Sequence, residues 1–161
     1  MIVTTKHGDQ GNTVLFGAKR VSKHHFKIEI IGQLDQLQVV IGLLKTKVSK
    51  TRILAELLAI QKTLYRTMAA IANTKALISQ ELATETKQLE VWQAFWIKKS
   101  SIKNQFVIPG QNEAEAFAHL ARTQTRQVER LLSKHKQIEL IPYFNRLSDY
   151  FFVISQYLLK P

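Results

Sequence analysis

The amino-terminal segment combines glycines, hydroxyls and a cation in a way that could bind phosphate. Gly8 and Gly11 lie three residues apart, and glycines at this spacing let the backbone turn tightly and bring its N–H groups close to an anion. The hydroxyls of Thr5 and Thr13 could donate to phosphate oxygens, and Lys23 adds positive charge. An ordinary structural turn explains the same spacing. The segment is not the Gly-x4-Gly-Lys-Ser/Thr loop of common nucleoside triphosphatases.

A second polar cluster lies on one face of a predicted helix. Arg122, Arg126 and Glu129 are spaced four and three residues apart, and His119 begins the same stripe. Two arginines one turn apart repel each other unless something anionic lies over them. A polyphosphate or carboxylates of a neighbouring element would supply such an anion, and a solvated charged face is the alternative. Asp35, on an earlier predicted helix, is a candidate partner that could tie helices or subunits together.

A third cluster falls near the start of the last predicted helix. Asn145 and Asp149 are one turn apart on the face opposite the apolar stripe, which suits hydrogen bonding or Mg²⁺ held through water. Polar decoration of a helix start explains the pair equally well. We reject a metal site at His24 and His25, because neighbouring helical residues point roughly 100° apart and no Cys or His cluster completes it.

The elements that must position these clusters are predicted to be helices. Apolar residues recur at steps of three and four, as in the stripe Leu34, Leu37, Ile41, Leu44 and Val48. The predicted helices cover roughly 28–48, 53–71, 78–96, 112–135 and 142–158. Asn112 is expected to cap the fourth, and Pro142 to lie in the first turn of the fifth. We expect an all-α antiparallel bundle of about five helices over 28–158, after an ordered amino-terminal loop or short extended segment over 1–27.

Composition limits the function classes. A chain of 161 residues with 45% hydrophobic residues is expected to form a single domain, 1–161, rather than a disordered protein. The apolar runs are shorter than the ~20 residues of a membrane-spanning helix, and the absence of cysteine and of an apolar signal core favours a cytoplasmic address. The net charge of +11 attracts polyanions, but its even scatter counts against a nucleic-acid-binding arm.

Taken together and in this order, the clusters resemble the PduO-type ATP:cob(I)alamin adenosyltransferases over nearly the whole chain. Each motif is modest alone, so the specificity lies in their combination. The motifs are Thr5-x-x-Gly8-Asp9-x-Gly11-x-Thr13, Arg20-Val21-Ser22-Lys23, Gly32-Gln33-Leu34-Asp35-Gln36-Leu37, Phe106-Val107-Ile108-Pro109-Gly110, Ala121-Arg122-Thr123-x-x-Arg126-x-x-Glu129-Arg130 and Asn145-Arg146-Leu147-Ser148-Asp149-Tyr150-Phe151-Phe152.

The resemblance implies a homotrimer of helical bundles with each active site between two subunits. Its ATP-binding residues would be Thr5, Lys6, Gly8, Asp9, Gly11, Thr13, Lys23, Arg126, Glu129 and Asn145. The loop would wrap the triphosphate, and Glu129 and Asn145 would also help to hold Mg²⁺. Arg126, Asp35 and Arg122 would be the catalytic residues, with Asp35 and Arg122 paired across the subunit boundary. Phe106 would lie near the corrin.

The implied reaction transfers the 5′-deoxyadenosyl group of ATP to Co(I) of cobalamin or another corrinoid, giving adenosylcobalamin and triphosphate. Co(I) is itself the nucleophile, so no catalytic Ser, Cys or His is needed. The protein must align the reactants and stabilise the charged leaving group with Arg, Lys and Mg²⁺. A reductase that generates Co(I) and a B12-dependent enzyme would be its partners, with no nucleic acid and no membrane.

Four residues in or next to three of the motifs depart from the family pattern and leave an alternative open. Gln36, Gln111 and Gln127 stand where the family usually has Glu, Gly and Arg, and Gln38 stands for Asn. Loss of a cation at position 127 could cost roughly 2 to 4 kcal/mol of transition-state stabilisation. The alternative is a non-catalytic ATP- or corrinoid-binding sensor or carrier of the same fold.

Overall fold

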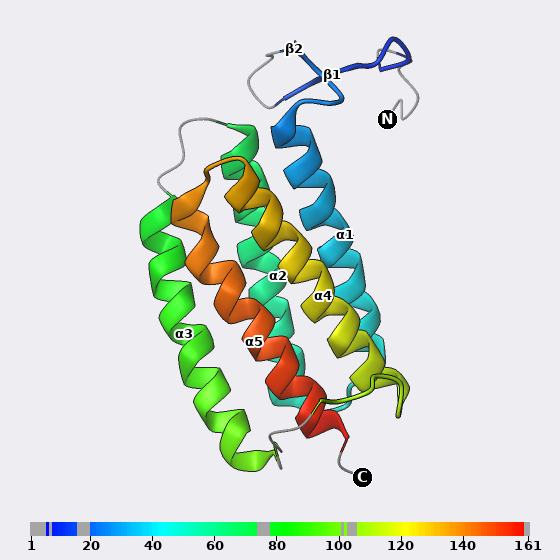
Figure 1. Ribbon diagram of the computed structural model, residues 1–161, viewed down its shortest axis with the longest axis vertical. Helices are drawn as coiled ribbons and strands as arrows, with labels where there is room; N and C mark the ends of the chain where they lie inside the picture. The colour runs from blue at the N-terminus through cyan, green and yellow to red at the C-terminus, as the bar shows by residue number, and fades with distance from the viewer. Residues whose placement is uncertain are drawn as a thin grey trace.

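Five α-helices and a small β-hairpin make up the protein in a computed structural model that describes residues 6, 8–15, 20–73, 78–100, 102 and 106–159 (Figure 1). The elements in chain order are β1 (Asn12–Val14), β2 (Arg20–Ser22), α1 (Phe26–Thr46), α2 (Thr51–Ala72), α3 (Ile78–Lys99), α4 (Glu113–Lys134), the 3-10 turn η1 (Ile138–Leu140) and α5 (Ile141–Leu158). The five predicted helices are confirmed. The two strands refine the expected amino-terminal loop or extended segment.

The helices close into a ring in which consecutive neighbours pack together. The order around the bundle is α1, α2, α3, α5, α4 and back to α1. Successive helices alternate in direction, so four of the five neighbouring pairs are antiparallel, as predicted, while α3 and α5 run the same way (Figure 1). A ring with an odd number of alternating helices must contain one such parallel pair.

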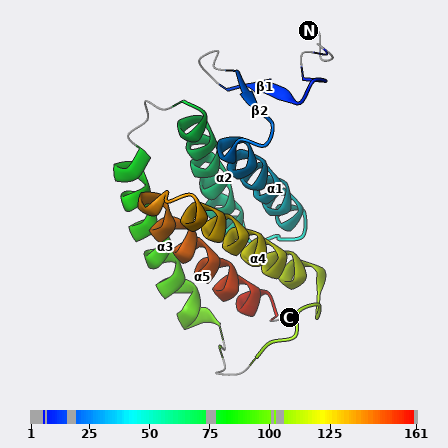
Figure 2. The same cartoon turned by 45° about the horizontal axis from the view of Figure 1, so that its top comes forward.

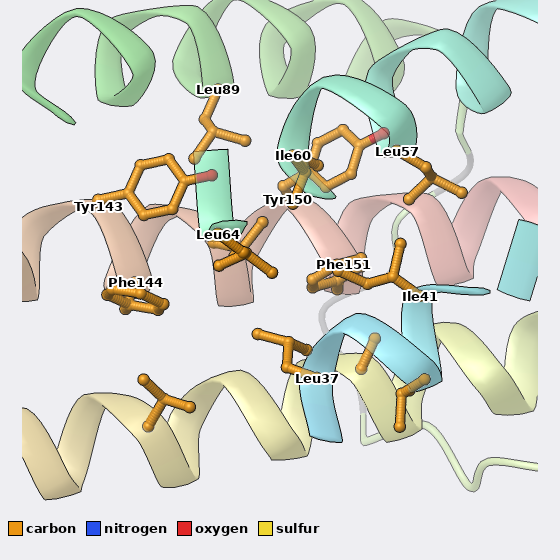
Figure 3. Close-up of a cluster of buried hydrophobic side chains, with 14 of the residues drawn as sticks. Leu37, Ile41, Leu57, Ile60, Leu64, Leu89, Tyr143, Phe144, Tyr150 and Phe151 are labelled. Carbon is orange, nitrogen blue, oxygen red and sulfur yellow. The ribbon is translucent and has the colours of Figure 1, made fainter. Parts of the chain in front are cut away.

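The core is formed by the predicted apolar stripes. All five residues of the first stripe are buried, and the α2 stripe of Ile53, Leu57, Ile60 and Leu64 faces them. Tyr143, Phe144, Tyr150 and Phe151 of α5 fill the centre between these helices (Figure 3). Burying a large apolar side chain contributes about 1.5–3 kcal/mol, so these stripes hold the bundle together.

A buried carboxylate links three helices inside this core. Glu56 of α2 is 4% exposed and accepts hydrogen bonds from Trp96 Nε1 of α3 (2.7 Å) and the Tyr150 hydroxyl of α5 (2.8 Å). Arg52 Nε donates to its other oxygen at 2.9 Å, and the Arg52 guanidinium stacks on the Phe95 ring. Burial and the nearby Glu56 raise the pKa of Tyr150 well above its usual range, so its hydroxyl keeps the proton that it donates.

Asn112 joins the start of α4 to the end of α5. Its side-chain oxygen accepts a hydrogen bond from the Glu115 amide (2.9 Å), which confirms the predicted N-cap. Its side-chain amide donates to the Leu158 carbonyl at 2.8 Å. Pro142 lies in the first turn of α5, as predicted, where a missing N–H costs nothing. The position of α4, which carries the arginine stripe, is therefore fixed at its first turn.

The hairpin stands off the end of the bundle where α1 begins (Figure 2). β1 and β2 are antiparallel, with Thr13 opposite Val21, and Lys23 N donates to the Gly11 carbonyl at 2.9 Å. Among the described residues, neither strand packs against any helix. The hairpin therefore lies outside the core that the helices form. No helix in the described ranges is long and apolar enough to cross a membrane.

Candidate functional site

The amino-terminal segment encloses a cleft of about 970 Å³. Its described lining is Lys6, Gly8, Asp9, Gln10, Asn12, Thr13, Val14, Arg20 and Lys23. Five of the predicted ATP-binding residues meet here. Gly11 does not line the cleft but turns the chain beside it with φ of +77°, a backbone conformation that favours glycine. Thr5 lies outside the described residues.

The Lys23 side chain lies close to the backbone of Gly8, which explains why a glycine stands at position 8. A Cβ added at Gly8 would lie only 3.3 Å from Lys23 Nζ, so a larger residue would push the ammonium aside. Lys23 itself is exposed, and three cations face one carboxylate across the cleft. The electrostatics suit a ligand with several negative charges, as a triphosphate has.

Arg20 is a cleft residue that the predicted ATP-binding set omitted, although it opens one of the motifs. The alternation of buried and exposed side chains along β2 could have predicted that Arg20 faces the cleft. Val21 is buried in β2, so its neighbours Arg20 and Ser22 must point to the opposite, open side. Arg20 pairs with Val14 across the hairpin and thereby reaches the cleft wall.

A second polar group lies between α4 and α5. Arg126 Nη1 is 4.0 Å from Glu129, and Asn145 donates from its amide nitrogen to Glu129 Oε1 at 3.2 Å. Arg146 donates to Asn145 Oδ1 at 2.6 Å and lies 3.8 Å from Asp149. Burial raises the pKa of Asp149, and Glu129 adds to this, while Arg146 and Arg126 oppose it. The three predicted residues Arg126, Glu129 and Asn145 are thus brought together on one surface.

The oxygen atoms of this group suit Mg²⁺ in chemical type. Glu129 offers a carboxylate and Asn145 an amide oxygen, the donors that Mg²⁺ prefers. Among the residues that the structure describes, no cluster of three or more acidic, histidine or cysteine side chains forms. A magnesium ion here would take its remaining ligands from substrate phosphate and water. Asn145 Oδ1 would first have to exchange its hydrogen bond from Arg146 for the ion.

Arg122 points its Nε at a histidine rather than at a carboxylate. The Nε atom donates to His119 Nδ1 at 3.2 Å, and burial together with Arg126 lowers the pKa of Arg122. Asp35 is exposed on α1 and forms no ion pair with any described residue of this chain. The predicted pairing of Asp35 with Arg122 across a subunit boundary stays a prediction.

Phe106 is fully exposed in the segment that precedes α4. Ile108, two residues on, is 83% exposed, so this short stretch presents two large apolar side chains to its surroundings. Exposed apolar groups side by side in a loop are typical of binding surfaces. Phe106 is therefore free to contact a ligand, and its place near the corrin stays a prediction.

The hairpin cleft and the α4–α5 group are separate within one chain. The strands pack only with each other, whereas Arg126 and Glu129 lie on a helix whose neighbours are α1, α5 and η1. Figures 1 and 2 both show the hairpin beyond the end of the bundle. The structure thus brings most of the predicted ATP-binding residues together in two groups rather than in one.

Comparison with known proteins gives a single result. A family model described as cobalamin adenosyltransferase matches residues 3–158. A corrinoid adenosyltransferase from Citrobacter freundii is 33% identical, over 96% of this chain and 93% of its own. A corrinoid adenosyltransferase from Bacillus subtilis (strain 168) is 32% identical, over 97% of this chain and 86% of its own.

Solved structures agree with the sequence matches. A phenylalanine-to-histidine variant of a PduO-type ATP:corrinoid adenosyltransferase from Lactobacillus reuteri, complexed with cobalamin and ATP, superposes with a TM-score of 0.88. It is 25% identical, and the match covers 98% of this chain and 91% of that one. An arginine-to-lysine variant from the same organism, complexed with ATP, gives a TM-score of 0.86 at 25% identity, over 98% of this chain and 94% of that one. The chain belongs to the cobalamin adenosyltransferase family.

Proposed function

We propose that this chain transfers the 5′-deoxyadenosyl group of ATP to Co(I) of cobalamin or a related corrinoid, releasing triphosphate. Membership of the family over residues 3–158 and the 33% identity to a corrinoid adenosyltransferase support this activity. In the reaction the cobalt lone pair forms the Co–C bond to the 5′ carbon while the C–O bond to the triphosphate breaks. The electron pair of that bond leaves with the triphosphate.

The residues of this chain would bind, orient and stabilise charge. Lys6, Arg20 and Lys23 would neutralise the departing triphosphate in the hairpin cleft, and the backbone N–H groups near Gly8 would donate to its oxygens. Arg126 would contact phosphate from the other side. Glu129 and Asn145 would hold the nucleotide together with Mg²⁺, which offsets phosphate charge when bound. No side chain is required as the attacking group.

We also propose a homotrimer whose active sites lie between subunits. The observation that carries this proposal is the separation of the two site groups within one chain. A hairpin that packs on none of its own helices can reach the arginine stripe of a neighbouring copy. Residues 1–27 would then form the ATP-binding segment, residues 28–158 the bundle, and Asp35 would face Arg122 of the next subunit.

The corrinoid would lie against the apolar stretch that contains Phe106. Its exposed ring could cover one face of the macrocycle and exclude water, which favours four-coordinate Co(I). A reductase that supplies Co(I) and an enzyme that uses the adenosylated product would act before and after this step. A cytoplasmic location stays a prediction.

An adenosylation assay tests the function. Purified protein, ATP, Mg²⁺ and chemically reduced cobalamin should give a light-sensitive product, whose visible spectrum changes when light breaks the new Co–C bond. No product, in a reaction where Co(I) is seen spectroscopically, would contradict the proposal. Tight binding of both ATP and corrinoid without turnover would instead identify a sensor or carrier, the reading that Gln36 and Gln127 leave open.

A further inference from the structure

Two buried titratable side chains in contact on α4 have no role in the function described so far. Glu115 is completely buried and His119 is 4% exposed, and their Oε1 and Nε2 atoms lie 3.1 Å apart. The contact has the distance of an ion pair but not the angles of a hydrogen bond. Burying a carboxylate and an imidazole is costly unless both are held by partners. The partners of this pair lie on two different functional elements.

On one side the pair holds the arginine stripe. Arg122 Nε donates to His119 Nδ1 at 3.2 Å, so Nδ1 must be the unprotonated nitrogen. The imidazole is then neutral, with its single proton on Nε2, the nitrogen that lies 3.1 Å from Glu115 Oε1. Burial is the main cause that lowers the pKa of His119, and Glu115 and Arg122 are the charged groups that act on it. The contact from α5 is the uncharged ring of Phe152, and α1 meets α4 nearby through the neutral amides of Gln33 and Gln124.

On the other side the pair holds the segment that precedes α4. Glu115 Oε2 accepts hydrogen bonds from the backbone amides of Gly110 (2.8 Å) and Gln111 (3.2 Å). Gly110 has φ of +108°, which lets two successive amides point at one oxygen. This is the segment whose exposed Phe106 is expected to meet the corrin. The Glu115 carboxylate therefore binds the segment expected to meet the corrinoid. Through His119 it is also linked to Arg122, on the helix expected to meet the nucleotide.

We propose that Glu115 and His119 are positioning residues that couple the placement of segment 106–111 to the orientation of the Arg122 guanidinium. The inference rests on the proposed adenosyl transfer. The hydrogen bond from Nε to His119 fixes the plane of the Arg122 guanidinium. Its two terminal nitrogens then keep one orientation toward a ligand or a neighbouring subunit. Misplacement of a group by about 1 Å can cost about 100-fold in rate. Order on the corrinoid side would thus be transmitted to the site that holds the nucleotide.

Two substitutions of similar polarity separate this role from simple packing. His119→Asn places an amide oxygen near the position of Nδ1 and can still accept from Arg122. His119→Gln reaches the position of Nε2, meets Glu115 and leaves Arg122 without its acceptor. We expect kcat to fall about 10- to 100-fold in H119Q and by less than about threefold in H119N, with similar thermal midpoints. Equal losses in two equally stable variants would overturn the coupling.

The pH profile provides a readout that does not depend on either variant folding. Protonation of His119 removes its acceptor and repels Arg122, so kcat of the wild-type enzyme should fall at acid pH. Glu115→Gln removes the charge that raises the His119 pKa, and should move this fall to lower pH. An unchanged acid limb in E115Q would refute the inference. Loss of product in the wild type would remove the proposed function as well, whereas an active wild type with an unmoved profile removes only this inference.

Discussion

Arg126 is the arginine of the α4 stripe that is most open to a ligand. Its side chain is 51% exposed, and its contact with Glu129 is 4.0 Å long, too long for a strong hydrogen bond. Exposed ion pairs of this kind contribute at most about 1 kcal/mol to stability. Arg126 can therefore turn to a phosphate at little cost. Gln127, the adjacent residue, is exposed as well.

Replacing Gln127 by arginine should raise the rate of adenosyl transfer. A second planar cation beside Arg126 would stabilise the departing triphosphate, and we expect kcat to rise about 10- to 100-fold. Gln127→Met, which is similar in size but uncharged, is the matched control and should not exceed the wild type. Steady-state rates with saturating ATP check this. An unaltered rate in Q127R would show that position 127 does not face the leaving group.

The stability of the protein should fall as the solution becomes acidic. The folded pKa of His119 is below the ordinary value of 6.5, so the unfolded chain takes up a proton first as the pH drops. The contribution of neutral His119 to the free energy of unfolding is complete above about pH 6.5. It is lost as the pH falls from there through the lowered pKa of the folded state. Urea unfolding at pH 7.5 and 5.5 should show a smaller decrease for H119N than for the wild type. An equal decrease in both would assign the effect to other groups.

At the scale of the helices, periodicity was enough to predict the bundle. The α1 stripe and the capping by Asn112 follow from local spacing, and the helix ends lie within three residues of those expected, close to the usual uncertainty of helix ends. The contact of Glu115 with His119 has the i,i+4 spacing of a local helical pair, but the hydrogen bonds that Glu115 accepts from the amides of Gly110 and Gln111 could not be predicted in this way, because they follow from the turn at Gly110. Nor could Glu56, whose acceptor role depends on residues 40 and 94 positions away. Its place three residues after Ile53 on a buried stripe is the one local signal.

Removing the Glu56 carboxylate should destabilise three helices at once. Glu56→Ala leaves the Trp96 N–H and the Tyr150 hydroxyl buried without an acceptor, and we expect a loss of about 3–5 kcal/mol in the free energy of unfolding. Urea denaturation followed by tryptophan fluorescence measures this. Glu90→Ala on the exposed surface of α3 is the control and should cost less than about 1 kcal/mol. A loss as small as the control's would mean that water replaces the carboxylate.

At the scale of the assembly, the separated site groups lead to a test by complementation. Lys23→Ala damages the hairpin cleft and Arg126→Ala damages the arginine stripe, so each variant alone should be nearly inactive. If a site takes its hairpin from one subunit and its arginine from the next, random mixed trimers contain one intact site each. An equal mixture should then regain activity in about a quarter of all sites.

The subunits must be allowed to exchange, for example by co-expression or by joint refolding, before activity is measured. Mixing without exchange is the control and should leave the activity of the separate variants unchanged. Sites formed within one subunit would give no recovery under either condition. Recovery after exchange would locate each active site at a boundary between copies.

The hairpin that packs on none of its own helices also bears on how the enzyme matures. Every member of the central core cluster lies between Ile30 and Ile154, while Leu15 and Val21 of the amino-terminal segment are outside it. The bundle can thus fold as a unimolecular event, because the contacts of this core lie within one chain. In the proposed trimer the cleft meets the arginine stripe of another copy only after subunits associate, so catalytic activity should return after helicity, with a lag that shortens as protein concentration rises.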